Sequence, residues 1–305
     1  MVQLEKLSVN RVSTGYLTKY KFPSTSLSLS TQFNIFIPSS ASSSSPVPVL
    51  FYLAGLTCNE DTGAQKGGFF NKAGEEGIAL VFPDTSPRGS GIEGEDDDWQ
   101  LGTGASFYIN ANTEKWKKHY KMYDLIVKEL PQVLKDADLG LDFSRWSIMG
   151  HSMGGHGALS IYLKNPAIRS LIYGFNCSNP SVVPWGINAF SNYIVTRTRS
   201  LPPMEWMEHD SYFLFHQYQG DINILVDVGT DDQFLKAGQL TPEVFEQLGK
   251  EGVQVRRQEG FDHSYYFASA FISTFAPEHI AFHAKHLKAQ VPGAAPRVCS
   301  TEYED

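Results

Sequence analysis

The sequence has 305 residues, of which 42% are hydrophobic and 19% charged, and its formal net charge is -8. This composition excludes a largely disordered chain and indicates one large domain over residues 1–290, followed by a tail at 291–305. The negative charge comes without a lysine or arginine stripe, so we expect neither a nucleic acid nor a membrane surface as partner.

Two further features bear on the compartment. The first twelve residues, MVQLEKLSVNRV, lack the apolar core of a signal peptide, and no apolar run approaches the roughly 18–20 residues of a membrane span. The three cysteines, Cys58, Cys177 and Cys299, have no paired or metal-type spacing, which is typical of free thiols in a reducing compartment. We therefore expect a cytoplasmic protein.

The first predicted element is an antiparallel strand. Residues 26–37 (SLSLSTQFNIFI) alternate polar and apolar side chains, which predicts a strand with one solvent-facing side in an N-terminal hairpin. Residues 39–48 are rich in serine and are interpreted as a surface loop.

After this loop, short apolar strands alternate with amphipathic helices, of which the clearest covers roughly residues 119–137. Apolar strands separated by helices predict a mostly parallel central sheet with helices on both faces, an α/β fold. The predicted strands are residues 49–55, 78–84, 145–150, 170–175, 222–229 and 253–260.

Residues 150–154, Gly-His-Ser-Met-Gly, match the pattern G-x-S-x-G. A buried strand runs directly into the motif and a helix start rich in small residues follows, as a nucleophile elbow requires. Glycines are needed because side chains two residues before and after the serine would collide across this tight turn. We therefore expect Ser152 to be the nucleophile of an α/β-hydrolase fold.

In this fold the acid and then the histidine follow the serine along the chain. Asp231 and Asp232 come just after the strand at 222–229, and because consecutive side chains point in different directions, only one of them can face the histidine. We choose Asp232, keep Asp231 as the alternative, and consider Asp227, inside the strand, less suitable. His263 directly follows the last predicted strand and is the expected base.

Three other histidines, His279, His283 and His286, lie further along the next helix and are expected to face solvent. His279 and His283 have the i, i+4 spacing of a zinc pair, but Ile280 stands where a zinc protease has its glutamate. We expect no metal and no other cofactor.

The oxyanion formed during acyl transfer needs hydrogen-bond donors. One is expected to be the backbone N–H of Met153, at the start of the helix after the nucleophile. The other must come from the loop after the first parallel strand, where the N–H of Leu56 is the best candidate.

At this point the sequence resembles the S-formylglutathione hydrolase (esterase D) family over nearly the whole chain, from about residue 26 to 288. The segments that carry the resemblance are YLAGLTCNED (52–61), VFPDTSPRG (81–89), GTGASFYINA (102–111), MYDLIVKELP (122–131), GHSMGGHGAL (150–159), NPSVVPWGINAF (179–190), DDQFL (231–235) and FDHSYYF (261–267).

The resemblance implies a cytosolic serine thioesterase, often a homodimer, that hydrolyses S-formylglutathione to glutathione and formate in formaldehyde detoxification through a formyl-serine intermediate. Carried over by motif, the nucleophile falls on Ser152, the acid on Asp232, the base on His263, and the oxyanion donors on Leu56 and Met153. These positions agree with the reading of the residues themselves.

The resemblance also implies an acyl-pocket tryptophan at Trp185, for which simple core packing is the alternative, and a thiol near the site at Cys58. We interpret Cys58 as a bystander whose modification blocks the site. Residues 267–279 carry about one helical turn more than the family, and residues 194–203 depart from it. The acidic run Glu93–Asp98 is interpreted as a solvated loop with no assigned role.

Two alternatives to this function stay open: a general short-chain carboxylesterase, and a non-catalytic hydrolase-fold protein that binds ligands. The sequence does not identify the residues that contact the glutathione moiety, and Arg88 is considered for that role without being assigned to it.

Overall fold

The computed structural model describes residues 2–166, 168, 172–174, 180–265 and 271–289. The predicted tail at 291–305, together with Cys177 and Cys299, lies outside the described residues. So does part of the segment at 267–279 that differs from the family.

Nine strands form one sheet in the order β1-β2-β3-β5-β4-β6-β7-β8-β9. The first three strands and the β3/β5 pair are antiparallel, whereas every neighbouring pair from β5 to β9 is parallel. The strands are β1 (Glu5–Val12), β2 (Gly15–Ser24), β3 (Leu29–Pro38), β4 (Val47–Leu53), β5 (Ala79–Pro83), β6 (Leu141–Gly150), β7 (Ile172–Gly174), β8 (Ile224–Gly229) and β9 (Val253–Gln258).

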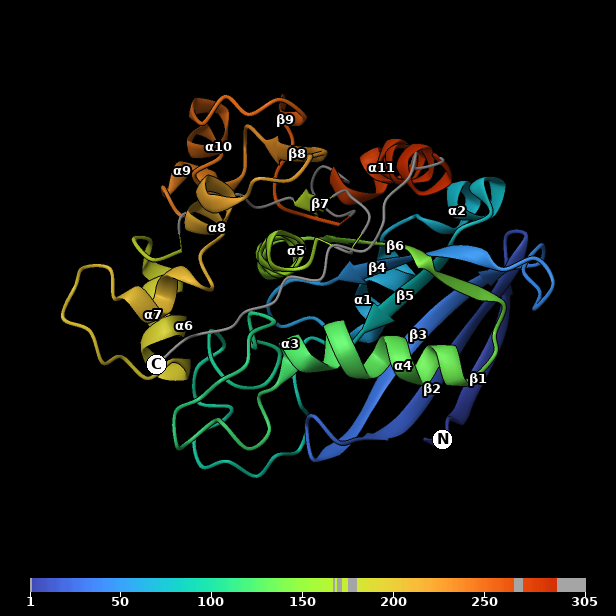
Figure 1. Cartoon of the computed structure of the whole chain (residues 1–305), viewed down its shortest axis with the longest axis horizontal. Helices are drawn as coiled ribbons and strands as arrows, with labels where there is room; N and C mark the ends of the chain where they lie inside the picture. Colours follow the sequence, from blue (N-terminus) through green and yellow to red (C-terminus); the bar gives the residue numbers. More distant parts are fainter. Residues whose placement is uncertain (1, 167, 169–171, 175–179, 266–270, 290–305) are drawn as a thin grey trace.

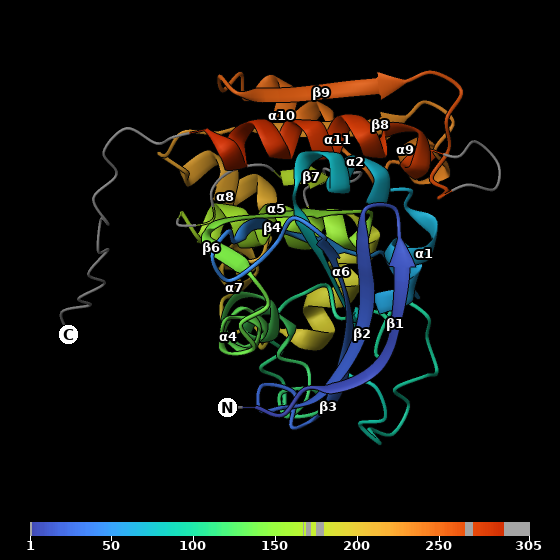
Figure 2. The ribbon, with the colours of Figure 1, turned by 90° about the vertical axis from the view of Figure 1, so that its right-hand side faces the viewer.

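The predicted mostly parallel sheet with an N-terminal antiparallel part is confirmed, and β1 extends the expected hairpin to three strands. Residues Glu5–Arg11 of β1 are exposed, so this strand buries no apolar face that would single it out in the sequence. In Figure 2, β9 runs across the view while β1 and β2 run up and down it, which shows the strong twist of the sheet.

Helices cover both faces of the sheet (Figure 1). One hydrophobic cluster joins the sheet to α1, α2 and α11, and the other joins it to α4, α5, α8 and α10. The helices are α1 (Glu60–Lys66), α2 (Phe70–Glu76), α3 (Met122–Asp124), α4 (Leu130–Asp136), α5 (Met153–Lys164), α6 (Pro184–Tyr193), α7 (Met204–Met207), α8 (Ser211–Gln217), α9 (Gln233–Lys236), α10 (Glu243–Gln247) and α11 (Phe271–Lys288).

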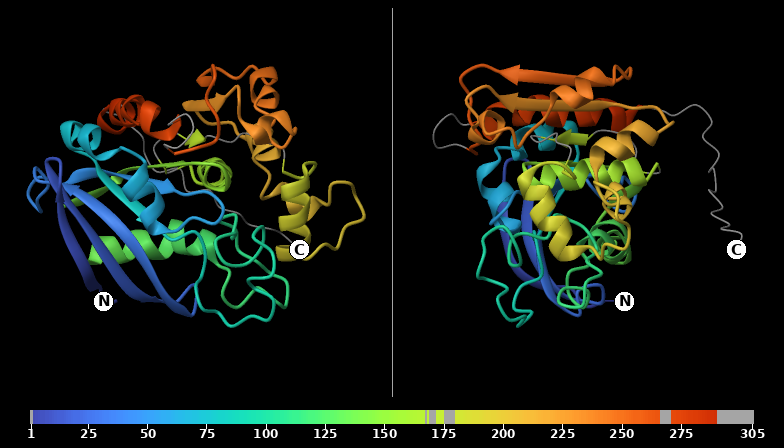
Figure 3. Two further views of the ribbon diagram at one scale, coloured as in Figure 1. Left: turned by 180° about the vertical axis from the view of Figure 1, so that it is seen from behind. Right: turned by 90° about the vertical axis from the view of Figure 1, so that its left-hand side faces the viewer.

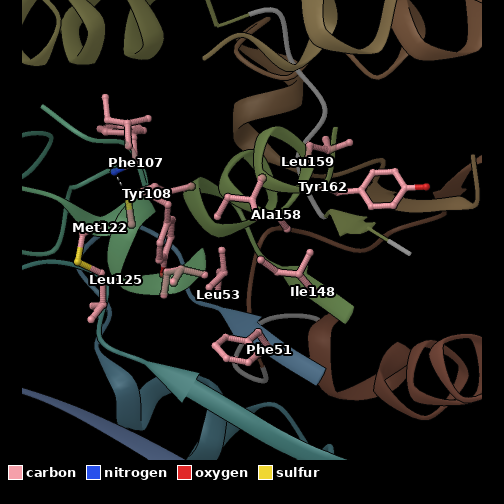
Figure 4. Close-up of a cluster of buried hydrophobic side chains, with 14 of the residues drawn as sticks. Phe51, Leu53, Phe107, Tyr108, Met122, Leu125, Ile148, Ala158, Leu159 and Tyr162 are labelled. Atoms are coloured by element: carbon pink, nitrogen blue, oxygen red, sulfur yellow. Dashed lines mark hydrogen bonds between the residues drawn. The ribbon is translucent and has the colours of Figure 1, made fainter. Parts of the chain in front are cut away.

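The helix predicted at 119–137 is found as α3 and α4, joined by the π-helical turn η1 (Leu125–Glu129). In Figure 4, α5 with Ala158 and Leu159 lies above β6 with Ile148 and β4 with Phe51, and all four side chains belong to one hydrophobic cluster. These side chains are fully buried, which fixes the helix that starts at the predicted nucleophile.

At one end of the molecule, the α6–α7 segment lies beside the long loops between β5 and α3 (Figure 3). Tyr193 of α6 joins the two parts, because its hydroxyl accepts a hydrogen bond from Gly102 N–H at 2.7 Å. Among the described residues, no helix is both long and apolar enough to cross a membrane.

Candidate active site

Ser152 sits on the turn between β6 and α5 with φ 56° and ψ -121°. A positive φ is uncommon for any residue with a side chain and persists only where the surroundings enforce it. The flanking glycines allow the turn: a Cβ on Gly150 would lie 2.1 Å from the carbonyl oxygen of Gly154, and one on Gly154 would lie 2.0 Å from that of Leu53. The motif therefore has the backbone geometry of a nucleophile elbow.

Asp232 caps the N-terminus of α9, just beyond β8, and its side chain is buried. Its Oδ1 accepts hydrogen bonds from the N–H groups of Phe234 at 2.7 Å and Leu235 at 3.3 Å. Its Oδ2 lies 2.5 Å from Nδ1 of His263. The neighbouring Asp231 points elsewhere, since it is exposed and pairs with Lys236 at 2.7 Å.

A pocket of about 220 Å³ brings the predicted residues together. Because Nδ1 of His263 is engaged by Asp232, Nε2 is the ring nitrogen left for proton exchange with a group in this pocket. Asp232 stands behind the histidine rather than on the pocket wall. The predicted residues that line the pocket are Ser152, His263, Leu56, Met153, Trp185 and Cys58.

Met153 is the first residue of α5, so its N–H has no partner inside the helix. The positive end of the helix dipole adds a favourable field for an anion at this point. Leu56 lies on the loop after β4 and reaches the same pocket. The two predicted oxyanion donors thus belong to two elements that meet at Ser152.

Trp185 belongs to α6 and forms part of the pocket wall. Its ring stacks on Phe107 with the centroids 5.3 Å apart and the planes only 6° from parallel. Its indole N–H donates a hydrogen bond to the carbonyl oxygen of Gln239 at 3.1 Å. Trp185 is therefore both packed and pocket-lining, and its ring is held in one orientation.

Cys58 also reaches the pocket, although most of its side chain is buried. Burial raises the pKa of its thiol, and hydrogen bonding to Thr62 partly opposes this shift. The side chain is therefore a neutral thiol at physiological pH and a weak nucleophile.

His151, which directly precedes Ser152, was not singled out in the sequence. Its ring is buried and lies 4.5 Å from the ring of His263, centroid to centroid. Burial holds the pKa of His151 well below its usual value, and His263 nearby lowers it further. A neutral imidazole therefore forms one side of the space in which His263 sits.

Other pocket residues were also missed by the sequence analysis: Trp99, Gln100, Phe107, Phe234, Gln239 and Leu240. Trp99 is 54% exposed, so it forms the rim rather than the floor. They come from two regions far apart in the chain, the loop between β5 and α3 and the segment formed by α9 and the loop after it. Phe107 and Phe234 lie in segments that carry the family resemblance, but nothing in the sequence placed them at the pocket.

The interpretation of Glu93–Asp98 as a wholly solvated loop is wrong at Glu95, which is only 6% exposed. Its carboxylate accepts hydrogen bonds from the hydroxyls of Ser90 and Tyr120, each at 2.5 Å. One hydroxyl from within this loop and one from Tyr120, 25 residues further along the chain, therefore anchor the loop that carries Trp99 to the pocket.

The prediction that the histidines of α11 face solvent is wrong for His279 and His283, both of which are fully buried. His279 Nε2 lies 2.6 Å from Oδ2 of Asp227, and His283 Nδ1 lies 2.9 Å from the hydroxyl of Ser147. Because α11 packs across the sheet, a helix face that carries these histidines meets polar groups on β8 and β6.

Residues 194–203 do not line the pocket that contains Ser152. Instead, Val195 N–H donates to Asn112 Oδ1 at 2.6 Å, and Glu205 accepts from Arg197 N–H at 2.9 Å. The segment that departs from the family therefore does not itself form the described wall of this pocket. Within the described part of the chain, no group of three or more His, Cys, Asp or Glu side chains is placed to hold a metal ion.

Comparisons with known proteins identify the family to which the chain belongs. The profile of the family described as "Putative esterase" matches residues 24–282. An S-formylglutathione hydrolase of Mus musculus is 43% identical over 291 residues, which cover 94% of this chain and 99% of the relative. One of Arabidopsis thaliana is 43% identical over 290 residues, covering 93% of this chain and 98% of the relative.

A solved S-formylglutathione hydrolase structure from Agrobacterium tumefaciens is similar with a TM-score of 0.83 and 36% sequence identity, covering 93% of this chain and 99% of that one. The similarity therefore extends over nearly the whole chain, whose sheet with helices on both faces is an α/β-hydrolase fold. This chain belongs to the S-formylglutathione hydrolase family of esterases.

Proposed function

We propose that this protein hydrolyses S-formylglutathione to glutathione and formate, with Ser152 as nucleophile, His263 as general base and acid, and Asp232 as the group that orients and charge-balances the histidine. The observation that carries the proposal is a serine on a strained elbow, in one pocket with a histidine whose far nitrogen is held by a buried carboxylate. That arrangement activates a hydroxyl that is otherwise a poor nucleophile.

In the first half of the reaction, Oγ of Ser152 attacks the thioester carbonyl carbon while its proton passes to Nε2 of His263. The N–H groups of Leu56 and Met153 stabilise the oxyanion, worth roughly 3–4 kcal/mol for each donor. The intermediate then expels the glutathione thiolate, which takes the proton from His263 and leaves a formyl ester on Ser152.

In the second half, His263 removes one proton from water as its oxygen attacks the formyl ester, and this proton then passes to Oγ of Ser152 as the ester bond breaks. The product is formic acid, which loses its remaining proton to solvent and leaves as formate. Because the pKa of a thiol is about 8.5, a thiolate needs less protonation by a general acid in order to leave than an alkoxide does. The triad therefore suits a thioester well.

The acyl side of the pocket supports a small acyl group. Trp185 is held by stacking on Phe107 and by the hydrogen bond to Gln239, so it cannot swing aside without losing both contacts. We expect Trp185→Ala to increase activity on butyryl esters relative to formyl and acetyl substrates.

The test is a comparison of kcat/KM for S-formylglutathione and for an aryl acetate, with Ser152→Ala as the inactive control. The proposal expects a clear preference for S-formylglutathione. A preference for the acetate would instead indicate a general carboxylesterase, and a folded protein that neither turns over substrate nor reacts with a fluorophosphonate would indicate a binding protein.

We further propose a cytosolic homodimer, on the strength of the family resemblance. Light scattering on the purified protein measures the molar mass, and a single-chain mass at micromolar concentration would contradict the dimer. Fractionation of the source cells tests the compartment, and recovery of the protein in organelles would contradict a cytosolic location.

A further inference from the structure

The loop Gly55–Cys58 carries Leu56 between β4 and α1, and its backbone is strained. Thr57 has φ 63°, a conformation that costs a β-branched residue of order 1–3 kcal/mol. Such a loop keeps its shape only if its neighbours hold it. The direction of the Leu56 N–H therefore depends on contacts outside the loop.

On one side, Thr57 N–H donates to the carbonyl oxygen of Gly104 at 3.0 Å. On the other, the carbonyl oxygen of Cys58 accepts two hydrogen bonds, from Thr85 Oγ1 at 2.5 Å and from Arg88 Nη2 at 2.8 Å. The main-chain carbonyl two residues after Leu56 is thus tied to the segment that follows β5.

Arg88 is itself held in place. Its Nε lies 3.2 and 3.1 Å from the two carboxylate oxygens of Asp84, and its Nη2 lies 2.8 Å from Oδ1. Asp84 is only 4% exposed, and its Oδ1 also accepts from Thr85 N–H at 2.7 Å. A planar guanidinium bound along one edge by a carboxylate presents its remaining donors in a fixed direction.

We propose that Arg88 is a positioning residue for the oxyanion hole: braced by Asp84, it holds the carbonyl of Cys58 and so keeps the Leu56 N–H aimed at the oxyanion. The inference rests on the proposed function only in that Leu56 serves as an oxyanion donor. It assigns to Arg88 a role within the protein instead of contact with glutathione.

The role predicts a particular kinetic signature. When a mutation weakens an interaction that forms only in the transition state, kcat falls and KM does not rise. Lysine keeps the positive charge but lacks the planar fork that binds both carboxylate oxygens of Asp84 and fixes the direction of the donor to the Cys58 carbonyl. We therefore expect Arg88→Lys to lower kcat roughly 10- to 100-fold, with KM changed less than about twofold.

A probe that mimics the transition state separates positioning from general damage. Phenylboronic acid forms a tetrahedral adduct with a serine hydroxyl, and its affinity should fall in Arg88→Lys by the same factor as kcat/KM. The affinity for the product glutathione should stay unchanged. The matched control is Arg145→Lys, because Arg145 likewise pairs with a carboxylate, Asp142, and a main-chain carbonyl, that of Pro46, outside the described pocket lining.

Thr85→Val provides a second test, since it removes the other donor to the same carbonyl and leaves the Arg88–Asp84 pair intact. Thr85→Val should also lower kcat with little change in KM. In the double variant, kcat should fall by less than the product of the two single fold-reductions, because both side chains bind the same carbonyl oxygen. If Arg88→Lys fails to fold, Thr85→Val alone decides the matter through its kcat and its phenylboronic acid affinity.

A raised KM with unchanged kcat, or unchanged affinity for phenylboronic acid, would overturn the proposal. A raised KM with unchanged kcat would indicate that Arg88 binds the substrate. Failure of the proposed function looks different: the wild type would not hydrolyse S-formylglutathione. The Arg88 series would then be measured with an aryl acetate and phenylboronic acid, which depend only on the serine and its oxyanion hole.

Discussion

Two aspartate–histidine pairs of almost equal length lie in this molecule, both formed between the region of β8 and the chain after β9. Asp232 lies 2.5 Å from His263, and Asp227 lies 2.6 Å from His279. The first pair borders the pocket that contains Ser152, whereas the second is fully buried between the sheet and α11.

The pairs differ most in what else binds the carboxylate. Arg256 donates to both oxygens of Asp227, at 2.7 and 2.6 Å, and these hydrogen bonds raise the pKa of Arg256. The charge of Asp227 is therefore already balanced, and burial keeps the pKa of His279 well below its usual value. Asp232 has no lysine or arginine partner among the described residues, so its charge can stabilise an imidazolium when one forms on His263.

A short distance between an aspartate and a histidine is therefore not by itself evidence of catalysis. The Asp227–His279 pair is completely buried and its carboxylate is permanently paired with Arg256, so it stabilises the fold. The Asp232–His263 pair adjoins a pocket that contains a serine, and its carboxylate has no lysine or arginine partner among the described residues, which is what the proposed catalytic role requires.

The largest effect should come from Asp232→Asn. The variant keeps the shape of the side chain but favours the wrong tautomer of His263 and cannot balance its charge, so kcat should fall about 10³- to 10⁴-fold. Steady-state rates on S-formylglutathione and on an aryl acetate measure the loss. A reduction of less than tenfold would place the orienting carboxylate elsewhere.

The matched substitution in the other pair, Asp227→Asn, should act on stability. Arg256 would lose its buried counter-charge but keep Glu278, so the free energy of unfolding should fall by about 1–3 kcal/mol, while kcat per folded molecule changes little. Urea unfolding followed by circular dichroism, together with active-site titration, measures both quantities. Loss of kcat in a variant that stays fully folded would erase the distinction between the pairs.

The buried histidines of α11 should affect how the free energy of unfolding depends on pH. Burial lowers the pKa of His283 to about 3 in the folded protein, against a usual value of 6.5. Between these values only the unfolded chain binds the proton, so lowering the pH reduces the free energy of unfolding by about 1.4 kcal/mol per pH unit for this residue.

His283→Gln should therefore make the loss of stability with falling pH less steep by about that amount below about pH 6.5. Urea unfolding at several pH values measures the slope. An identical slope in the variant would mean that His283 is protonated in the folded state.

The smallest effect should come from Cys58→Ser, although this side chain lines the pocket. The thiol is neutral and no step uses it, so kcat should stay within about threefold of wild type. Alkylation of the wild type should block activity, and the variant should resist the reagent. A folded Cys58→Ser variant without activity would give the thiol a direct role.

The sequence was sufficient to predict the parallel part of the sheet, because its inner strands are short apolar runs, but it gave no signal for the exposed strand β1. The predicted strands at 49–55 and 222–229 overlap β4 and β8 closely. It also led to Ser152, since steric limits restrict which residues can flank a serine on such a turn. These features depend on local sequence.

What escaped prediction depends on partners far away in the chain. The burial of His279 depends on Asp227, 52 residues earlier, and that of Glu95 on Tyr120, 25 residues later. The role of Arg88 depends on the carbonyl of Cys58, which no side-chain pattern can reveal. Residue type and spacing carry little information about such contacts.

The proposal that His263 activates Ser152 is tested by fluorophosphonate labelling of the wild type, of His263→Gln and of His279→Gln. The measurement gives the rate of labelling and the residue that is labelled. We predict one label per chain on Ser152, a labelling rate at least about 100-fold lower in His263→Gln, and a near wild-type rate in folded His279→Gln. Labelling on another residue, or an undiminished rate in His263→Gln, would contradict the account.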